Sequence, residues 1–395
     1  MRVFESVDRI EALGVGINLL PHAVRELAAL GVLERIAAAG LAPTTLAYYT
    51  KRGEEIWHEP RGHAAGYQWP QVSAHRGELH VALYEAVVDR IGADRVTTGC
   101  HLAGFDATAS GVVASFIDRR TGAERARVNA DVLVAADGIH SAVRRVFYPD
   151  EGPPIWNGAK LWRGLTEAPR LLDGRTMVWC GHRNQKFVGY PLRDLPNDRQ
   201  LVNFIAELRV EGEELAERED WNQPGVLSDF LPPFEGWKFP WLDVPSLLRS
   251  APGTFLFPMV DRDPVAAWTH GRVTLLGDAA HPMYPVGSNG ASQAILDAQT
   301  LAGCLRSYPH DIDHALVRYD EIRRPATGAI VLANRGMGPE LPMQLVEDRA
   351  PDGFASLGDV ISPAEIVQAT DGYRKTAGFA LNALNDRPSL ADTDY

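Results

Sequence analysis

The sequence is poor in several features, and each deficit excludes a class of protein. Its 395 residues contain three cysteines and no Cys-x-x-Cys pair, so no disulfide framework is expected and a reducing, cytoplasmic location is predicted. Lys and Arg number 39 against 51 Asp and Glu, which argues against a nucleic-acid or anionic-membrane partner. No apolar run could cross a bilayer, and the first residues lack the pattern of a signal peptide.

Repeats, low-complexity segments and a clear metal-binding cluster are also absent. His310 and His314 have the helical i, i+4 spacing of metal ligands, but no third ligand is evident, so no metal site is predicted. What is present is an apolar fraction of 45%, enough for a sizeable core in two closely packed domains.

The most informative segment spans residues 272–297. Val273 to Leu276 form a short apolar run that predicts a buried strand. Gly277 allows a close turn, and Asp278 then presents a carboxylate at the carboxyl end of that strand, where open α/β sheets bind ligands. A loop rich in Pro and Gly, residues 285–290, opens a helix whose free N–H groups and positive dipole end favour negative charge. A flavin offers both a ribityl hydroxyl for the carboxylate and an anion for the helix.

Other patterns suit an α/β nucleotide-binding domain. Residues 2–6 predict a strand that ends in an acidic residue, and residues 21–30 and 79–91 predict amphipathic helices. Residues 131–137 predict a buried strand of the parallel type, which is followed by Gly138 and a helix over 141–146.

The pattern changes between residues 155 and 268. Prolines recur, and runs such as 176–180 and 201–205 are typical of strands, which predicts a mostly antiparallel sheet with a large apolar pocket surface. The nucleotide-type pattern resumes at Arg272 and weakens after Arg335. We therefore expect an α/β protein with a discontinuous Rossmann-like domain (1–154 and 269–335), an inserted α+β substrate domain (155–268) and a partly helical C-terminal tail (336–395).

These motifs together resemble a known family. Asp137-Gly138, the segment Gly277-Asp278-Ala-Ala-His281-Pro and the pair His75-Arg76 make the chain similar to the class A flavoprotein monooxygenases, the p-hydroxybenzoate hydroxylase superfamily. Pieces at 14–18, 161–164, 258–264 and 289–297 resemble its phenazine-hydroxylating branch. Taken singly, Asp137-Gly138 would be an ordinary turn, Arg76 a surface arginine and His281 a residue that orients the turn. The complete Gly-Asp segment favours flavin binding.

The resemblance implies an FAD-dependent monooxygenase that consumes NADH or NADPH and O2 and hydroxylates a small aromatic substrate through a flavin hydroperoxide. It also implies the roles of particular residues. Those expected at the cofactor are Glu5 on the adenosine ribose, Gly14 and Val15 beside the flavin, Arg76 on its flavin side, Asp137, Gly277 with Asp278 on the ribityl chain, Pro285 near the reacting face, and the backbone of Gly287, Asn289 and Gly290. Those expected at the substrate are Tyr190, which would also take part in catalysis, with Trp162 and Arg163.

Two of the substrate assignments have structural alternatives. Trp162 suits core packing equally well, and Arg163 could form a structural ion pair rather than recognise a substrate carboxylate.

The family's opening Gly-x-Gly-x-x-Gly turn is missing. Gly14-Val-Gly16 follows no predicted strand, and Leu19 occupies the third glycine position, whereas Glu5 matches the acidic residue that ends the second strand. We therefore expect the given chain to start at the second strand, and we favour a misassigned start codon over a true truncation. A true truncation would weaken FAD binding.

Three other functions are compatible with parts of this pattern. A flavin-dependent dehydrogenase or epoxidase would share every cofactor motif. A reductase that uses only NAD is disfavoured, because its glycine fingerprint is absent. A truncated, flavin-free, non-catalytic homologue is the alternative of a different class. The substrate and the oligomeric state, monomer or homodimer, stay open.

Overall fold

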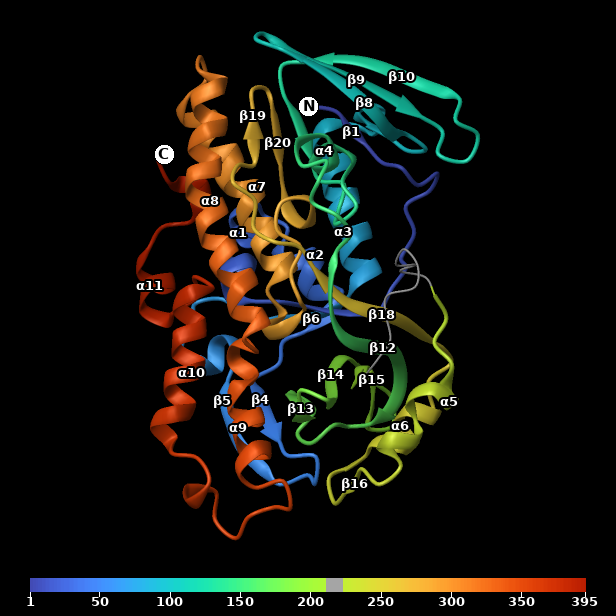
Figure 1. Cartoon of the computed structure of the whole chain (residues 1–395), viewed down its shortest axis with the longest axis vertical. Coiled ribbons are helices and arrows are strands. Elements are labelled where there is room, and N and C mark those ends of the chain that lie inside the picture. Colours follow the sequence, from blue (N-terminus) through green and yellow to red (C-terminus); the bar gives the residue numbers. More distant parts are fainter. Residues whose placement is uncertain (211–222) are drawn as a thin grey trace.

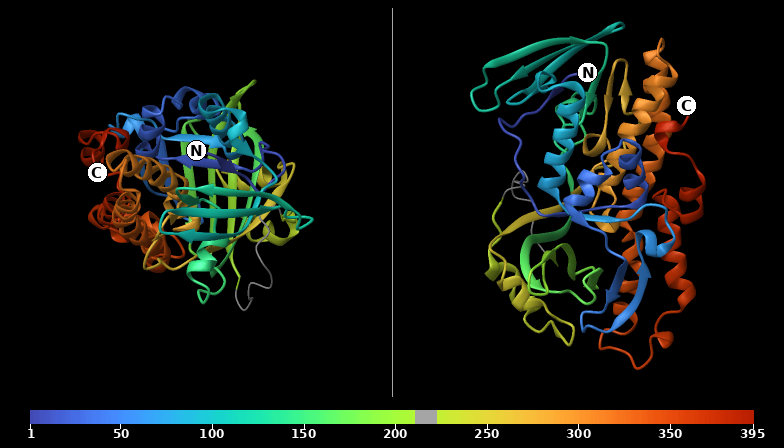
Figure 2. Two further views of the ribbon diagram at one scale, coloured as in Figure 1. Left: turned by 90° about the horizontal axis from the view of Figure 1, so that it is seen from above. Right: turned by 180° about the vertical axis from the view of Figure 1, so that it is seen from behind.

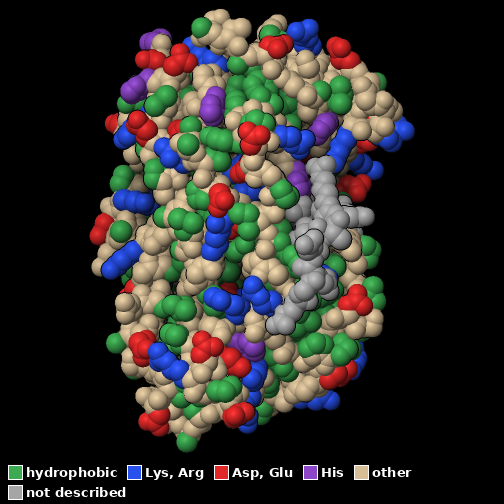
Figure 3. All heavy atoms as spheres, viewed as in Figure 1, with side chains coloured by type: hydrophobic (Ala, Val, Ile, Leu, Met, Phe, Trp, Pro, Cys, Tyr) green, Lys and Arg blue, Asp and Glu red, His purple; other side chains and the backbone are tan. Residues whose placement is uncertain are grey.

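The computed structural model describes residues 1–210 and 223–395. Nucleotide-type elements lie at one end of an elongated molecule and a large sheet at the other, with C-terminal helices along one side (Figure 1). On the face shown in Figure 3, acidic and basic side chains are interspersed over the part that the structure describes. Within these described ranges, no helix has the length and apolarity needed to cross a membrane.

The large sheet has seven strands in the order β18-β12-β15-β14-β13-β4-β5. Every neighbouring pair is antiparallel except β13 and β4, which run parallel. Their bounds are β4 Thr45–Tyr49, β5 Glu55–Pro60, β12 Ile155–Pro169, β13 Thr176–His182, β14 Gln185–Leu195, β15 Arg199–Arg209 and β18 Thr254–Asp261. The sequence-based limits 155–268 thus contain five of the strands, whereas β4 and β5 come from residues 45–60.

The two faces of this sheet pack against different parts of the chain, because successive side chains of a strand point to opposite faces. One face, with Phe204 and Ala206, packs against α5 Leu227–Phe230 and α6 Val244–Arg249. The other face, with Val188 and Tyr190, packs against α9 Leu341–Arg349 and the residues leading into α10 Pro363–Thr376. Figure 2 shows these C-terminal helices together on one side of the sheet.

The nucleotide-type part is built from four small sheets and the helices around them. Their strands are β1 Val3–Phe4 with β7 Val96–Thr97; β2 Gly16–Leu19 with β6 Val72–His75 and β3 Gly40–Leu41; β8 His101–Thr108, β9 Gly111–Ile117 and β10 Glu124–Ala130; and β11 Leu133–Ala135, β20 Val273–Leu275 and β19 Thr269–His270. A further two-stranded ribbon, β16 Lys238–Phe239 with β17 Leu242–Asp243, lies beside α6. Among the described residues, β1 and β11 belong to separate sheets.

The local predictions for this part are confirmed. The helix expected over 21–30 is α1 Pro21–Ala29, the one over 79–91 lies within α3 Arg76–Ile91, and the one over 141–146 is α4 Ala142–Phe147. The strand expected over 131–137 is β11, which pairs in parallel with β20. The remaining helices are α2 Leu33–Ala38, α7 Gly290–Ser307, α8 Ile312–Arg335 and α11 Leu381–Asp386.

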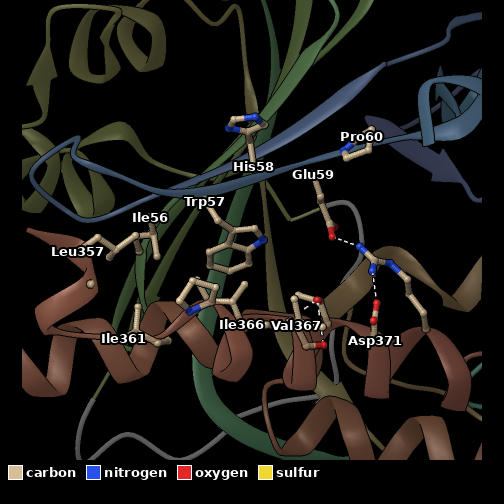
Figure 4. Close-up of a pocket in the computed structure, with 14 residues that line it drawn as sticks. Ile56, Trp57, His58, Glu59, Pro60, Leu357, Ile361, Ile366, Val367 and Asp371 are labelled. Carbon is tan, nitrogen blue, oxygen red and sulfur yellow. Dashed lines mark hydrogen bonds and ion pairs between the residues drawn. The ribbon is translucent and has the colours of Figure 1, made fainter.

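The C-terminal region is attached to the sheet through α10. A cavity of about 500 Å³ lies between β5 and α10, with Trp57 and Ile366 on its apolar walls (Figure 4). At its polar end, Glu59 of β5 forms an ion pair with Arg374, and Arg374 forms another with Asp371. These contacts fix α10 against the edge strand.

The start of α10 is stabilised by a reciprocal cap. Ser362 Oγ accepts a hydrogen bond from the N–H of Glu365 at 3.3 Å, and the Glu365 carboxylate accepts the N–H of Ser362 at 2.9 Å. We expect Ser362→Ala to lower the free energy of unfolding by about 1 kcal/mol, because a first-turn N–H loses its acceptor. Urea denaturation measures this. Ser356→Ala is the matched control, since Ser356 precedes a 3-10 helix without forming a side-chain cap, and equal losses in both variants would contradict the prediction.

Candidate functional site

The predicted Gly-Asp turn lies where β20 ends. Gly277 has φ of +61°, a conformation that favours glycine, and begins a short 3-10 helix, η4 Gly277–Ala279. The Asp278 side chain is accessible to water, yet desolvation by the surrounding protein raises the pKa of its carboxyl. We call the region around Asp278 the crevice; the carboxylate is open to solvent there, so a ligand could reach it.

A buried ionic network lies directly behind this turn. Asp297 of α7 accepts the N–H of Gly277 at 3.1 Å and contacts His281 Nε2 at 2.5 Å and Arg323 Nε at 2.7 Å. Burial opposes ionisation of Asp297, but the facing His281 and Arg323 outweigh it and lower the pKa of the carboxyl. His281 is therefore engaged in orienting the turn, as the sequence suggested.

The loop that follows carries the chain into α7. Pro285 is exposed, and Gly287 and Ser288 have φ of +69° and +56°. Both polar atoms of the Asn289 side chain are hydrogen-bonded inside the protein, to Tyr373 Oη at 3.1 Å and to Gln293 Nε2 at 3.2 Å. The Asn289 side chain is therefore not available to a ligand. The groups that remain available are backbone groups, including the unpaired N–H groups of the first turn of α7.

The turn at Asp278 and the loop before α7 form one wall of the crevice. The start of α3 and the segment before β2 form a second wall. Arg76 is exposed, and its N–H donates to the carbonyl of Val15 at 2.8 Å. Gly14 has φ of +115°, and its Cα lies against the Arg76 side chain, where an added Cβ would be 3.6 Å from Arg76 Cδ. The charge of Arg76 influences the pKa of both Asp278 and Arg163, so the three charged groups lie in one neighbourhood.

The large sheet supplies the third wall. Arg163 of β12 donates to the carbonyl of Gly16 at 3.0 Å, and its cation lies beside the hydroxyl of Tyr190 on β14. Burial raises the pKa of Tyr190 to about 12, against the influence of Arg163, so the phenol stays protonated at neutral pH. Asn203 of β15 accepts the N–H of Gly16 at 2.7 Å. Gly16 is thus hydrogen-bonded to the sheet through both its carbonyl and its N–H group.

Trp162, the third residue expected at the substrate, lies on the opposite face of the sheet from Arg163. It is 3% exposed and stacks on Phe230 with ring centroids 5.3 Å apart, inside the cluster that α5 and α6 cover. This placement matches the core-packing alternative.

Glu5 and Asp137 follow the strands β1 and β11. Asp137 is exposed, and its carboxylate accepts the N–H of Ala142 at the start of α4 at 2.7 Å. Since β11 and β20 are parallel neighbours, Asp137 and Asp278 follow the carboxyl ends of adjacent strands. The Glu5 carboxylate accepts the N–H of Val7 at 2.9 Å in the loop after β1.

The crevice suits the flavin end of FAD. It offers the accessible carboxylate of Asp278 for a hydroxyl-bearing chain, the cation of Arg76, and the first turn of α7 for an anion. Within the described ranges, no glycine-rich turn joins a strand to a helix in the manner of a pyrophosphate cradle.

The comparisons with known proteins agree with this geometry. The family described as FAD binding domain matches residues 9–223 and 257–333. The chain is 43% identical over 375 residues to phenazine 1,6-dicarboxylic acid hydroxylase PhzS of Lysobacter antibioticus, a match that covers 94% of this chain and 89% of that protein. It is 33% identical over 362 residues to a 3-amino-4-hydroxybenzoate 2-monooxygenase of Streptomyces platensis, covering 88% and 85%.

The fold is similar to that of an HpxO variant from Klebsiella pneumoniae complexed with FAD, with a TM-score of 0.74 and 24% identity over 95% of this chain and 91% of that one. An α/β flavoprotein is thus the class that the fold and site define. More narrowly, the chain belongs to the family of FAD-dependent aromatic monooxygenases, with FAD as cofactor and NAD(P)H as reductant.

Three residues near the crevice could not have been found from the sequence. Asn203, Asn334 and Tyr373 are isolated polar residues within strand or helix patterns, and their partners lie far away along the chain. No local motif distinguishes them from ordinary buried residues.

Proposed function

We propose that the protein hydroxylates a planar, electron-rich aromatic substrate of the phenazine type that carries an acidic group. The observation that carries this substrate class is the cation of Arg163, which forms no ion pair with any described residue. Arg163 is partly buried, and its neighbours among the described residues, the Gly16 carbonyl that accepts its hydrogen bond and the Tyr190 phenol, are uncharged. A partly buried cation with neutral neighbours favours an anionic ligand, and a guanidinium suits a carboxylate. Similarity to the phenazine 1,6-dicarboxylic acid hydroxylase supports this choice.

The residues of the crevice have separate roles in this proposal. Bound FAD, once reduced by NAD(P)H, supplies the transfer of an oxygen atom from O2 to the ring. Asp278 and Gly277 bind the ribityl chain, Arg76 with the segment at Gly14 and Val15 borders the flavin, and Asp137 lies at the neighbouring strand end. The backbone of Gly287, Asn289 and Gly290 stabilises negative charge, Pro285 packs near the reacting face, and Glu5 binds the adenosine ribose.

On the substrate side, the sheet supplies the polar contacts. Arg163 binds the acidic group and Tyr190 orients the ring through its hydroxyl, while Trp162 supports this wall from the other face of the sheet. The apolar side chains Val188 and Ile205, beside Tyr190 on the same face, help to exclude water.

Substrate-stimulated oxidation of NADH and NADPH tests the function directly. Phenazine carboxylates, salicylate and hydroxybenzoates would be compared, with oxygen uptake and the hydroxylated product measured in the same samples. Phenazine carboxylates are expected to stimulate most strongly. Reduction of the flavin without a hydroxylated product would indicate a dehydrogenase, and no stimulation by any aromatic acid would contradict the proposal.

Replacing Tyr190 with Phe is expected to lower kcat/KM for the preferred substrate about tenfold, because one buried hydrogen bond to a charged or polarised group is lost. Steady-state kinetics with the purified holoenzyme measure this. Tyr308→Phe serves as a control, since Tyr308 packs on His314 and against a hydrophobic cluster separate from those of the large sheet. Unchanged turnover and unchanged substrate affinity in the Tyr190 variant would exclude its assigned role.

We also propose a cytoplasmic enzyme that is either a monomer or a homodimer. Cys100, Cys180 and Cys304 are all free and buried, which supports a reducing compartment.

A further inference from the structure

The loop that precedes α7 has an unfavourable backbone conformation. It contains the 3-10 turn η5 Val286–Ser288, in which Gly287 and Ser288 both lie in the left-handed region. A non-glycine residue such as Ser288 adopts this region at a cost, so other contacts must hold the loop in place.

Those contacts come from Tyr373 on α10 and Asn334 on α8. The Tyr373 hydroxyl, on α10, lies 3.2 Å from the carbonyl of Val286, 2.9 Å from Asn334 Oδ1 and 3.1 Å from Asn289 Nδ2, which donates to it. Asn334 in turn donates to the carbonyl of Tyr284 at 2.9 Å. Together Tyr373 and Asn334 bind the loop near both of its ends.

Packing reinforces these hydrogen bonds. The Tyr373 ring lies directly against Gly287, where an added Cβ would be 2.4 Å from the hydroxyl oxygen. Tyr373 is 5% exposed, and burial raises the pKa of its phenol, so the hydroxyl keeps its proton at neutral pH. At neutral pH the hydroxyl can therefore donate one hydrogen bond and accept another.

We propose that Tyr373 is a positioning residue for the flavin. By holding residues 286–289, it keeps the first turn of α7 aimed at the cofactor and thereby sets how strongly the site favours the reduced, anionic flavin over the oxidised form. This inference rests on the proposed placement of the loop beside the flavin. In this inference α10 influences the redox chemistry, although the sequence suggests its region only as a tail.

The test is the reduction potential of bound FAD in Tyr373→Phe. If the loop loses its anchor, the helix N-terminus stabilises the anion less, and reduced FAD should bind about tenfold more weakly relative to oxidised FAD. For a two-electron couple, that ratio corresponds to a potential about 30 mV more negative. Equilibrium titration of the holoenzyme against a reference dye measures the potential, and fluorescence titration measures the affinity for oxidised FAD.

Tyr319→Phe is the matched control. Tyr319 is buried like Tyr373, lies on α8, and donates its hydroxyl to the carbonyl of Leu275 at 3.1 Å, outside the loop. Both variants should lose similar stability, but only Tyr373→Phe should shift the potential. Gly287→Ala, which displaces the hydroxyl from the other side, should shift it in the same direction and serves if the first variant folds poorly.

Equal potentials in the wild type, Tyr373→Phe and Gly287→Ala would overturn the inference while leaving the proposed function intact. An equal shift in Tyr319→Phe would also overturn it, since any loss of a buried hydroxyl would then suffice. A wild-type protein that binds no FAD would instead contradict the proposed function itself.

Discussion

Asp278→Asn is expected to weaken FAD binding by roughly 10- to 100-fold, because a hydrogen bond to a charged group contributes about 1.5–3 kcal/mol. The same change should not destabilise the FAD-free protein. Desolvation raises the pKa of Asp278, so its ionised carboxylate is a cost in the empty crevice, and a neutral amide removes that cost. The affinity for FAD should therefore fall, while the stability of the FAD-free protein stays the same or rises.

Fluorescence titration of FAD and urea denaturation of the FAD-free protein measure the two effects. The pH dependence adds a second check. Because the pKa in the folded state is above its unfolded value, this group makes the folded protein less stable as pH rises from the unfolded pKa through the folded one. The Asn variant should lack that decline.

The control for this change is Asp359→Asn, an exposed aspartate in another short 3-10 helix, η7 Leu357–Asp359. It should leave FAD binding unchanged. If Asp278→Asn bound FAD as tightly as the wild type, the assignment of Asp278 to the ribityl chain would be wrong.

The largest loss of stability is expected for Asp297→Ala. This change leaves Arg323 and His281 buried without their shared carboxylate and removes the acceptor of the Gly277 N–H. Breaking a buried pair by removing one partner costs about 3–5 kcal/mol. Urea denaturation at neutral pH measures the loss. Asp297→Asn keeps an acceptor for Gly277 and should lose less.

Asp297 also has a pH signature. Its pKa is lowered in the folded protein, so its contribution is present above the unfolded pKa and is lost as pH falls through the folded value. Asp89→Ala is the control, since Asp89 pairs with Arg35 on the surface, and it should cost less than about 1 kcal/mol. A comparable loss in the two alanine variants would show that the buried network contributes little.

The parts of the site that could be predicted from the sequence are those encoded by neighbouring residues. The apolar run before Gly277 and the loop after it determine a strand, a turn and a helix within one short segment, and the structure has all three. The patterns that predict α1 and β11 also lie within single short segments. Their patterns depend on backbone periodicity, which a sequence displays directly.

Contacts between distant segments could not be predicted. Asn203 and Gly16 are 187 positions apart, and Tyr373 and Val286 are 87 apart. Nothing near Thr45 indicates that β4 will pair in parallel with β13 rather than remain with the nucleotide-type elements. Such pairings depend on the packing of the whole chain. The side of the sheet on which Trp162 lies depends in the same way on strand register, where a shift of one residue exchanges the two faces.

In the large sheet, successive side chains alternate between the two faces. This alternation also bears on how the substrate specificity of such an enzyme can change. Arg163, Val188 and Ile205 point to one face of the sheet, where we propose that the substrate binds, whereas Trp162, Phe187 and Phe204 point into the core under α5 and α6. If the proposed substrate site is correct, substitutions in the first set would reshape it while the second set keeps the sheet folded. These positions are then the natural targets for directed evolution toward new aromatic substrates.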